Sequence, residues 1–249
     1  MDFDACEREI DGEPRPCYGR SILPLDEPPR FCTCPAGQAA LVRFEEGLAI
    51  KWPGAEVPAG LTGVRLHGTK RFHAKHPDRA DAIDAAERFV DAYRSGRRPG
   101  AGIAFFGPVG TGKTGVLAAI KHELNALGVP CLWYDYAGLV QAVQAQYGSS
   151  DMRDTRITNA QRCEVLFIDD LGDPFRDRGE TQETEDKRRI MQAVIGERVA
   201  RRRPTIVSAN YNSLGALSDQ FDLRIADRIR EMCECHAMPG DSMRRAPRI

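Results

Sequence analysis

The feature that most constrains the fold of this chain is an eight-residue run, GPVGTGKT, at residues 107–114. It matches the pattern GxxxxGK[ST], in which a glycine-rich loop follows a buried strand and opens a helix. The flanking sequence fits that context, since the apolar run GIAFF at residues 102–106 has the length and composition of a buried parallel strand. Apolar side chains then recur at helical spacing over residues 116–127, before Gly128 ends the pattern. The sequence therefore predicts a strand, a phosphate-binding loop and a helix in that order.

A loop of this kind binds phosphate groups through its backbone. Glycines allow N–H groups to turn towards phosphate oxygens, and the following helix adds the positive end of its dipole. Lys113 would reach the β- and γ-phosphates, and the hydroxyl of Thr114 would bind Mg²⁺. We therefore predict a nucleoside triphosphate site rather than a glycine-rich turn without a ligand. The residues expected at the nucleotide are Gly107, Pro108, Val109, Gly110, Thr111, Gly112, Lys113, Thr114 and Gly115.

A second motif, VLFIDD at residues 165–170, lies downstream of the loop. Four apolar residues that end in paired carboxylates are typical of a buried strand that delivers acids at its carboxyl edge, where ligands bind in open α/β sheets. Asp169 would hold Mg²⁺, directly or through water, and Asp170 would polarise the attacking water. On its own the pattern also fits a strand that ends at an Asp turn, but after the phosphate-binding loop it indicates a hydrolytic site.

The remaining periodic segments predict the fold class. Residues 131–134 and 204–210 read as two more short strands, and Asn210 at the end of the latter either caps the next element or reaches the γ-phosphate. Between them, residues 172–186 read as an acidic loop. Strands that alternate with helices predict an α/β fold of the P-loop type, with a mostly parallel sheet flanked by helices. The expected helices cover residues 77–96, 136–147, 187–202 and 217–232, of which the last is basic.

Composition places the chain among ordinary soluble globular proteins. It has 249 residues, of which 42% are hydrophobic and 29% are charged, and a formal net charge of −1. This balance neither suggests nor excludes a nucleic-acid partner. No apolar run reaches the roughly 18 residues that a membrane span needs, and the acidic N-terminus lacks a signal-peptide pattern. We therefore expect a cytoplasmic protein without a membrane partner.

The cysteines suggest a metal site near the N-terminus. Thiolates in a segment too short to bury its own core could be held by one tetrahedral Zn²⁺. Their spacing is irregular, so the alternative of unliganded cysteines stays open. The four cysteines of this segment are Cys6, Cys17, Cys32 and Cys34. A second candidate set lies near the C-terminus, at Cys233, Cys235 and His236.

Proline and glycine residues between positions 53 and 60 mark a connector, which predicts two domains. Residues 1–56 are expected to form a small Cys-rich module that binds a partner. Residues 57–249 contain every nucleotide motif and are expected to form the ATPase domain.

Five segments taken in order, GPVGTGKT, VLFIDDLG, TIVSAN, RIADRI and GDSMR, resemble the motifs of DnaC-type helicase loaders and their IstB-type transposition relatives, a branch of the AAA+ ATPases. The resemblance covers residues 57–249 and implies a role for three further residues. Asn210 would be the sensor-1 residue and Arg244 in GDSMR the sensor-2 residue. Arg228 in RIADRI would be the arginine finger, with Arg224 as the alternative.

The same resemblance implies a function. It implies an ATP-dependent loader that delivers a replicative hexameric helicase onto single-stranded DNA, uses ATP and Mg²⁺, and self-associates through its ATP sites. Asp170 stands where many AAA+ proteins carry Glu, which implies slow, switch-like hydrolysis. The cysteine-rich N-terminus is similar to a zinc-binding module that docks some loaders on the helicase.

Two alternatives stay open on sequence alone. An IstB-type helper ATPase would regulate a transposase on duplex DNA, and a nucleotide-dependent binding module would hydrolyse almost no ATP. Residues that could contact DNA through phosphates or base stacking also fit ordinary surface or core positions. They are Arg153, Arg156, Tyr136 and Tyr147.

The zinc hypothesis predicts about one Zn²⁺ per chain in protein purified without chelator, because one tetrahedral site takes four ligands. Cys32→Ser should then disturb the N-terminal module and partner binding but leave ATP binding intact, since the connector separates the two units. Metal analysis and thiol titration check this prediction. A protein without zinc whose eight cysteines all titrate in the folded state would contradict it.

Overall fold

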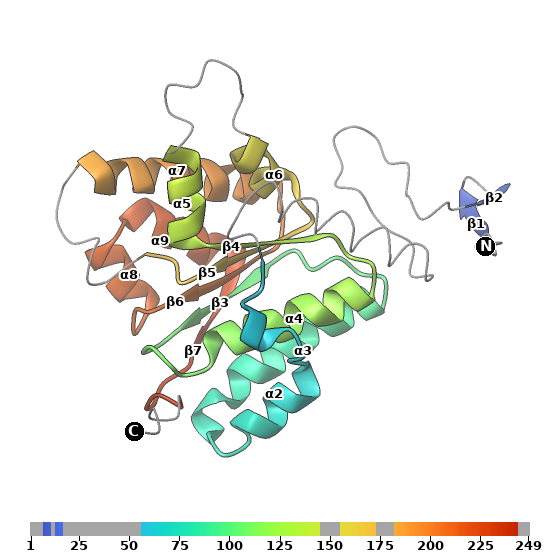
Figure 1. The fold of residues 1–249 in the computed structure, drawn as a ribbon, viewed down its shortest axis with the longest axis horizontal. Helices are drawn as coiled ribbons and strands as arrows, with labels where there is room; N and C mark the ends of the chain where they lie inside the picture. Colours follow the sequence, from blue (N-terminus) through green and yellow to red (C-terminus); the bar gives the residue numbers. More distant parts are fainter. Residues whose placement is uncertain (1–6, 11–12, 17–55, 145–154, 173–181, 244–249) are drawn as a thin grey trace.

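The computed structural model describes residues 7–10, 13–16, 56–144, 155–172 and 182–243. Its centre is a five-stranded parallel sheet with the strand order β4-β5-β6-β3-β7 (Figure 1). These strands are β3 (Gly102–Phe106), β4 (Cys131–Asp135), β5 (Val165–Asp169), β6 (Thr205–Ala209) and β7 (Cys233–Ala237). Near the N-terminus, β1 (Glu7–Ile10) and β2 (Glu13–Pro16) pair as an antiparallel hairpin.

Helices cover both faces of the five-stranded sheet (Figure 1). One face packs against α2 (Leu66–His73), α3 (Ala80–Arg94) and α4 (Lys113–Ala126). The other packs against α5 (Tyr136–Gln144), α6 (Thr155–Arg162), α7 (Gln182–Ala200), α8 (Leu214–Gln220) and α9 (Leu223–Met232). Two short 3-10 helices, η1 (Ala59–Leu61) and η2 (Pro77–Arg79), flank α2. No helix in the described ranges is long and apolar enough to cross a membrane.

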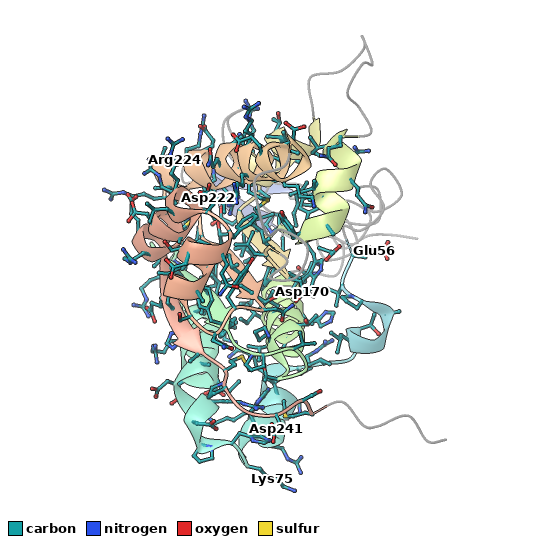
Figure 2. The ribbon with its side chains drawn as sticks, turned by 90° about the vertical axis from the view of Figure 1, so that its left-hand side faces the viewer. Glu56, Lys75, Asp170, Asp222, Arg224 and Asp241 are labelled. Atoms are coloured by element: carbon teal, nitrogen blue, oxygen red, sulfur yellow. The ribbon has the colours of Figure 1, made fainter. Side chains whose placement is uncertain are left out.

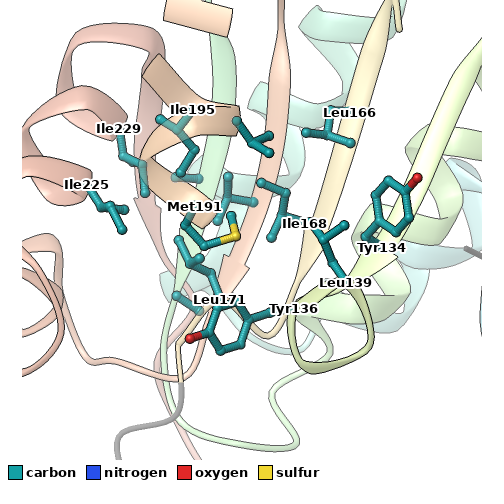
Figure 3. Packing of buried hydrophobic residues seen from close by; sticks show 14 of the residues in the cluster. Tyr134, Tyr136, Leu139, Leu166, Ile168, Leu171, Met191, Ile195, Ile225 and Ile229 are labelled. Carbon is teal, nitrogen blue, oxygen red and sulfur yellow. The ribbon is translucent and has the colours of Figure 1, made fainter. Parts of the chain in front are cut away.

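Successive side chains of β3, β4, β5 and β6 point alternately into two hydrophobic cores. Phe105 of β3 faces the core under α2, α3 and α4, whereas its neighbour Phe106 faces the core under α5 to α9. Figure 3 shows this second core, in which Ile168 of β5 lies near Met191 of α7. Because these four strands are buried on both faces, most of their positions need an apolar side chain. This requirement explains why the inner strands read as continuous apolar runs.

The amino-terminal edge of the sheet is anchored by Arg198 of α7, which is fully buried. Its guanidinium donates hydrogen bonds to Thr205 Oγ1 at 2.8 Å and to the carbonyl oxygens of Ala160 and Cys163 at 2.8 and 3.0 Å. These acceptors belong to the start of β6, to α6 and to the residues that lead into β5. Arg198 therefore fixes two central strands from the edge opposite to the one that carries the sequence motifs.

The structure confirms the predicted α/β fold and the four predicted strands, adds β7, α2 and α6, and corrects two predicted elements. β7 was not predicted, because its sequence CECHA lacks an apolar run. Residues 217–232 do not form one helix. They are divided between the end of α8 and the whole of α9. Asp222 separates the two helices, because its Oδ1 accepts the N–H of Ile225 at 2.8 Å and caps α9. α7 begins at Gln182, so the last part of the predicted acidic loop is helical.

Two expectations concern residues outside the described ranges. The domain boundary after residue 56 stays a prediction, because residues 17–55 are not among those that the structure describes. The four cysteines expected to hold zinc, Cys6, Cys17, Cys32 and Cys34, lie outside the described residues as well. The second candidate metal set lies on β7, and no group of three His, Cys, Asp or Glu residues within the described ranges could hold a metal ion. The described residues therefore give no support to that second site.

Candidate nucleotide-binding site

The motifs predicted from the sequence meet at the carboxyl edge of the sheet. β5, β6 and β3 are parallel neighbours, so the residues that follow them emerge side by side. β3 leads into the phosphate-binding loop, β5 ends at Asp169, and β6 leads into Asn210. A cavity with a volume of about 860 Å³ lies at this edge. Its polar wall includes the predicted residues Lys113, Thr114, Asp169, Asp170 and Asn210.

The phosphate-binding loop surrounds the ammonium group of Lys113. Gly110 and Gly112 have φ angles of 85° and 92°, in the left-handed region that glycine adopts without steric cost. The buried Nζ of Lys113 donates hydrogen bonds to the carbonyl oxygens of Gly107 and Pro108, each at 2.8 Å. Lys113 also begins α4, so the positive end of the helix dipole lies at the loop. A buried cation, a helix N-terminus and a glycine loop together suit a polyphosphate.

Asp169 is buried at the end of β5, and its Oδ1 accepts hydrogen bonds from Thr114 Oγ1 at 3.2 Å and from Ser208 Oγ. Burial, reinforced by the neighbouring carboxylate of Asp170, raises the pKa of Asp169 to about 6. The ionised form of Asp169 is thus destabilised by its surroundings, and a divalent cation would relieve this. Mg²⁺ is bound in proteins by one or two carboxylates completed by phosphate and water oxygens. Thr114 and Asp169 therefore fit the Mg²⁺ that the sequence predicts.

Asp170 is held by two residues of the neighbouring strand segment. Its φ angle of 53° lies in the left-handed region, which is uncommon for a residue other than glycine. Its Oδ1 accepts a hydrogen bond from Asn210 Nδ2 at 2.9 Å. Its backbone N–H donates to Ser208 Oγ at 2.8 Å, and the same hydroxyl donates to Asp169. Ser208 therefore positions both carboxylates.

Ser208 was not predicted as a site residue, although two features of the sequence point to it. Ser208 lies two positions before Asn210 on a strand, so the two residues point to the same side. A serine is also the only side chain in the strand TIVSA, apart from its first residue, that can donate and accept hydrogen bonds. These two facts mark it as a partner for acids on the adjacent strand.

Residues 56–73, for which the sequence predicted no element, line another part of the cavity with both apolar and polar side chains. Leu61 and Val64 line it, together with Trp133 of β4. His73 at the end of α2 lies against the phosphate-binding loop, because a Cβ on Gly112 would come within 2.9 Å of its ring. The cavity thus combines the polar loop and the acids with apolar side chains from η1, from the residues before α2 and from β4. This combination suits the phosphates and the base of one nucleotide.

The predicted finger residues do not belong to this cavity. Arg228 lies on α9 with its side chain 52% exposed, and it forms an ion pair with Glu231 at 3.1 Å. Arg224 is on the same helix, and Figure 2 shows it in the outer helical layer, away from Asp170. Neither arginine lines the cavity. Arg244, the predicted sensor-2 residue, lies outside the described residues.

Other predicted contacts have different outcomes. Gly107, Pro108 and Thr111 shape the loop but do not line the cavity. Tyr136 is a core residue, since it is buried and its ring meets that of Phe221 edge-on at 5.8 Å. It cannot stack on a nucleic-acid base without leaving the core. Arg156 donates to the carbonyl oxygen of Ala142 and so joins α6 to α5. Arg153 and Tyr147 lie outside the described residues.

Comparison with known proteins agrees with this geometry. A model of the ATPase family associated with various cellular activities (AAA) matches residues 103–232, just over half of the chain. The replicative helicase loader DnaC of Escherichia coli (strain K12) is 24% identical over 176 residues, which make up 68% of this chain and 66% of that relative. The chain thus spans about two thirds of the length of this curated relative.

Two solved structures share the fold. The crystal structure of DnaI has a TM-score of 0.58 and 24% identity, and the match covers 75% of this chain and 94% of that one. The crystal structure of the DnaC helicase loader has a TM-score of 0.59 and 20% identity, with 72% and 99% coverage. At these identities the two likenesses show the architecture of the sheet and helices.

The position of Ser208 predicts the effect of removing its hydroxyl. Ser208→Ala should lower nucleoside triphosphate turnover by about 10–100-fold, the range typical of losing a residue that orients metal ligands. Nucleotide affinity should change much less, because the phosphate-binding loop is untouched. Ser213→Ala is the matched control, since its hydroxyl only caps α8 and its loss should cost about 1 kcal/mol of stability. Equal turnover in both variants, measured by phosphate release, would contradict the assigned role.

Proposed function

The chain belongs to the ATPase family associated with various cellular activities (AAA), and on that premise we propose that it is an ATP-dependent loader of a replicative DNA helicase. The observation that carries the ATP-dependent part of the proposal is the convergence of Lys113, Asp169, Asp170 and Asn210 on one cavity. The similarity to a curated helicase loader supports the loader role. In this role the protein delivers a hexameric helicase onto single-stranded DNA.

The residues at the cavity suggest how ATP would be handled. Lys113 is held by loop carbonyls, and it would exchange them for phosphate oxygens when ATP binds. Thr114 and Asp169 would hold Mg²⁺, which neutralises phosphate charge when it is bound. Asp170 would orient and polarise the attacking water, and Asn210 holds its carboxylate in place.

We propose that hydrolysis is slow and acts as a switch. The aspartate side chain of Asp170 is one methylene shorter than glutamate, and the hydrogen bond from Asn210 engages one of its oxygens. Both features limit its reach towards a water molecule at the γ-phosphate. ATP binding would order a DNA-gripping assembly, and hydrolysis would release it.

The partner assignments extend the same proposal. The N-terminal module at residues 1–56, with its cysteines and the zinc they would bind, would dock on the helicase. The ATPase domain would contact single-stranded DNA and neighbouring copies of this chain in the cytoplasm. One curated relative and one solved structure that resemble this chain are themselves helicase loaders by name. They favour the loader over the transposition helper that the sequence also allows.

A loading assay tests the proposal directly. The full-length protein is mixed with the hexameric replicative helicase of the same host and with circular DNA that is either single-stranded or duplex. Helicase retained on the DNA is then measured by gel filtration. We expect retention on the single-stranded circle that requires both this protein and ATP. Retention on neither circle, or ATP-dependent binding of this protein to duplex DNA alone, would contradict the loader function.

We further propose that Arg228 acts on the ATP of a neighbouring subunit. Its side chain is more than half exposed, and its only ion pair among the described residues is the exposed contact to Glu231. An exposed pair of this kind stabilises a protein by about 0–1 kcal/mol and is easily exchanged for another anion. An ATP γ-phosphate presented by a second copy of the chain would be such an anion.

A mixing experiment tests the trans role of Arg228. Arg228→Ala should lower ATP turnover by several orders of magnitude, since an arginine finger contributes about 10³–10⁵ in other phosphate-loop enzymes. Mixed with inactive Lys113→Ala protein, it should regain part of the activity at interfaces that pair an intact loop with an intact finger. Arg230→Ala is the matched control, because Arg230 is also exposed on α9 in an ion pair, with Asp227 at 3.7 Å. Full activity of Arg228→Ala at saturating DNA and helicase would show that the residue is only part of the surface.

A further inference from the structure

Arg79 is a fully buried arginine to which the site described above assigns no role. It ends η2, between α2 and α3, and its side chain contacts two distant parts of the chain. Its Nη1 donates to the carbonyl oxygen of Thr111 in the phosphate-binding loop at 3.2 Å. Its Nε donates to the carbonyl oxygen of Pro239 at 2.7 Å, and Nη1 also lies 3.0 Å from the sulfur of Met243. One guanidinium thus joins the loop to residues 238–243, here called the C-terminal segment.

The C-terminal segment lies directly on the phosphate-binding loop. The N–H of Met238 donates to the carbonyl oxygen of Phe106 at 2.7 Å, and the N–H of Met243 donates to that of Gly110 at 2.9 Å. A Cβ on Gly110 would come within 2.1 Å of Ser242 Oγ, so the loop needs glycine there for this contact as well as for its φ angle. The carbonyl groups on one side of the loop are therefore satisfied by the C-terminal segment and by Arg79.

Stability alone does not account for a cation at this position. Removing a guanidinium from water is costly unless an anion or a full set of acceptors compensates it. Within the described residues Arg79 forms no salt bridge, and its Nη2 has no hydrogen-bond partner. That nitrogen faces Gly240, where a Cβ would come within 2.7 Å of it. An apolar side chain would fill the same space without the free-energy cost of burying a charge. The guanidinium is therefore better explained by its contacts to the phosphate-binding loop and the C-terminal segment.

The charge of Arg79 also reaches the nucleotide cavity. His73, which lines the cavity against Gly112, has its pKa lowered to about 4, first by burial and then by the positive charge of Arg79. The same field would favour phosphate groups at the loop. Arg79 therefore acts on the loop through geometry and through charge without lining the cavity itself.

We propose that Arg79 is a positioning residue that couples the C-terminal segment to the phosphate-binding loop, so that affinity for ATP depends on how that segment is held. The inference rests on the proposed nucleotide function and adds a means of regulating it. The C-terminal segment continues directly into Arg244. A partner or neighbouring subunit that moves the segment would thereby change the shape of the loop, and ATP would in turn fix the segment.

The first test replaces Arg79 by lysine, which keeps the charge but cannot bridge two acceptors with a planar fork. Binding of ATP with Mg²⁺ to the full-length protein is measured by calorimetry, well below the unfolding temperature of each variant. We expect Arg79→Lys to bind at least about fivefold more weakly than the wild type, the lower end of typical coupling between sites. Arg198→Lys is the matched control, because Arg198 is equally buried and also bridges carbonyl groups, but at the opposite edge of the sheet. It should lower the unfolding temperature and leave ATP affinity unchanged.

A second pair of variants decides the matter if Arg79→Lys does not fold. Gly240→Ala places a methyl group against Arg79 Nη2, at a φ angle of 99°. Gly96→Ala is its control, since Gly96 also has a positive φ angle, of 71°, but has no atom within 4 Å of the added methyl group. Weaker ATP binding in Gly240→Ala but not in Gly96→Ala supports the coupling.

Two results would overturn the proposal. The first is that a folded Arg79→Lys or Gly240→Ala variant binds ATP with the affinity of the wild type. The second is an equal loss of affinity in the Arg198 and Gly96 controls, since this would attribute the effect to general destabilisation. A wild-type protein that binds no ATP would instead refute the proposed nucleotide function, so the two failures are distinguishable.

Discussion

The nucleotide site depends on how the buried carboxylate of Asp169 is held at the end of β5. Burial and the adjacent Asp170 raise its pKa, so the folded chain keeps an acid where the ionised form is disfavoured. Ser208 and Thr114 offset this by donating hydrogen bonds to the carboxylate from β6 and α4. Both donors stay in place only while β5 and β6 remain paired in their observed register. The order of the strands is therefore a requirement of the chemistry as well as of the fold.

The phosphate-binding loop stabilises a buried cation, Lys113, in a similar way. Lys113 is almost inaccessible to solvent, and carbonyl oxygens of its own loop satisfy its ammonium group. On its other side the loop is fixed by the C-terminal segment and by Arg79. Acid and cation thus face one cavity, each held by neutral dipoles. A ligand that brings both a divalent cation and a polyphosphate would compensate both charges at once.

Sequence predicted the parts of this arrangement whose signals are local. The run VLFIDD identifies a strand and its acids, because a strand buried on both faces must be apolar throughout and a break in that pattern marks its end. β7 was not predicted for the same reason, since an edge strand that contains Glu234 and His236 has no continuous apolar run. Asp222 was read as a helix interior, although an aspartate can equally cap a new helix.

The residues that sequence missed in the site act through the fold. Ser208 matters because β6 lies beside β5, and Arg79 matters because the C-terminal segment, whose Pro239 lies 160 positions further along the chain, returns to it. Neither contact corresponds to a sequence motif of fixed spacing. Arg228 shows the opposite case, since its motif is local but its proposed target lies on another subunit. One folded chain therefore contains a binding site whose catalytic completion is expected from a second copy.

The central claim is that this cavity binds ATP with Mg²⁺ through the buried lysine and the paired carboxylates. Calorimetric titration of full-length protein with ATP and Mg²⁺ tests it, in the wild type and in Lys113→Ala and Asp170→Asn. We expect one site per chain in the wild type and loss of binding in Lys113→Ala, because no other group replaces the ammonium at the β- and γ-phosphates. Asp170→Asn should bind ATP like the wild type but fail to hydrolyse it, since Thr114 and Asp169 still hold the metal. Unchanged binding in Lys113→Ala would contradict the account.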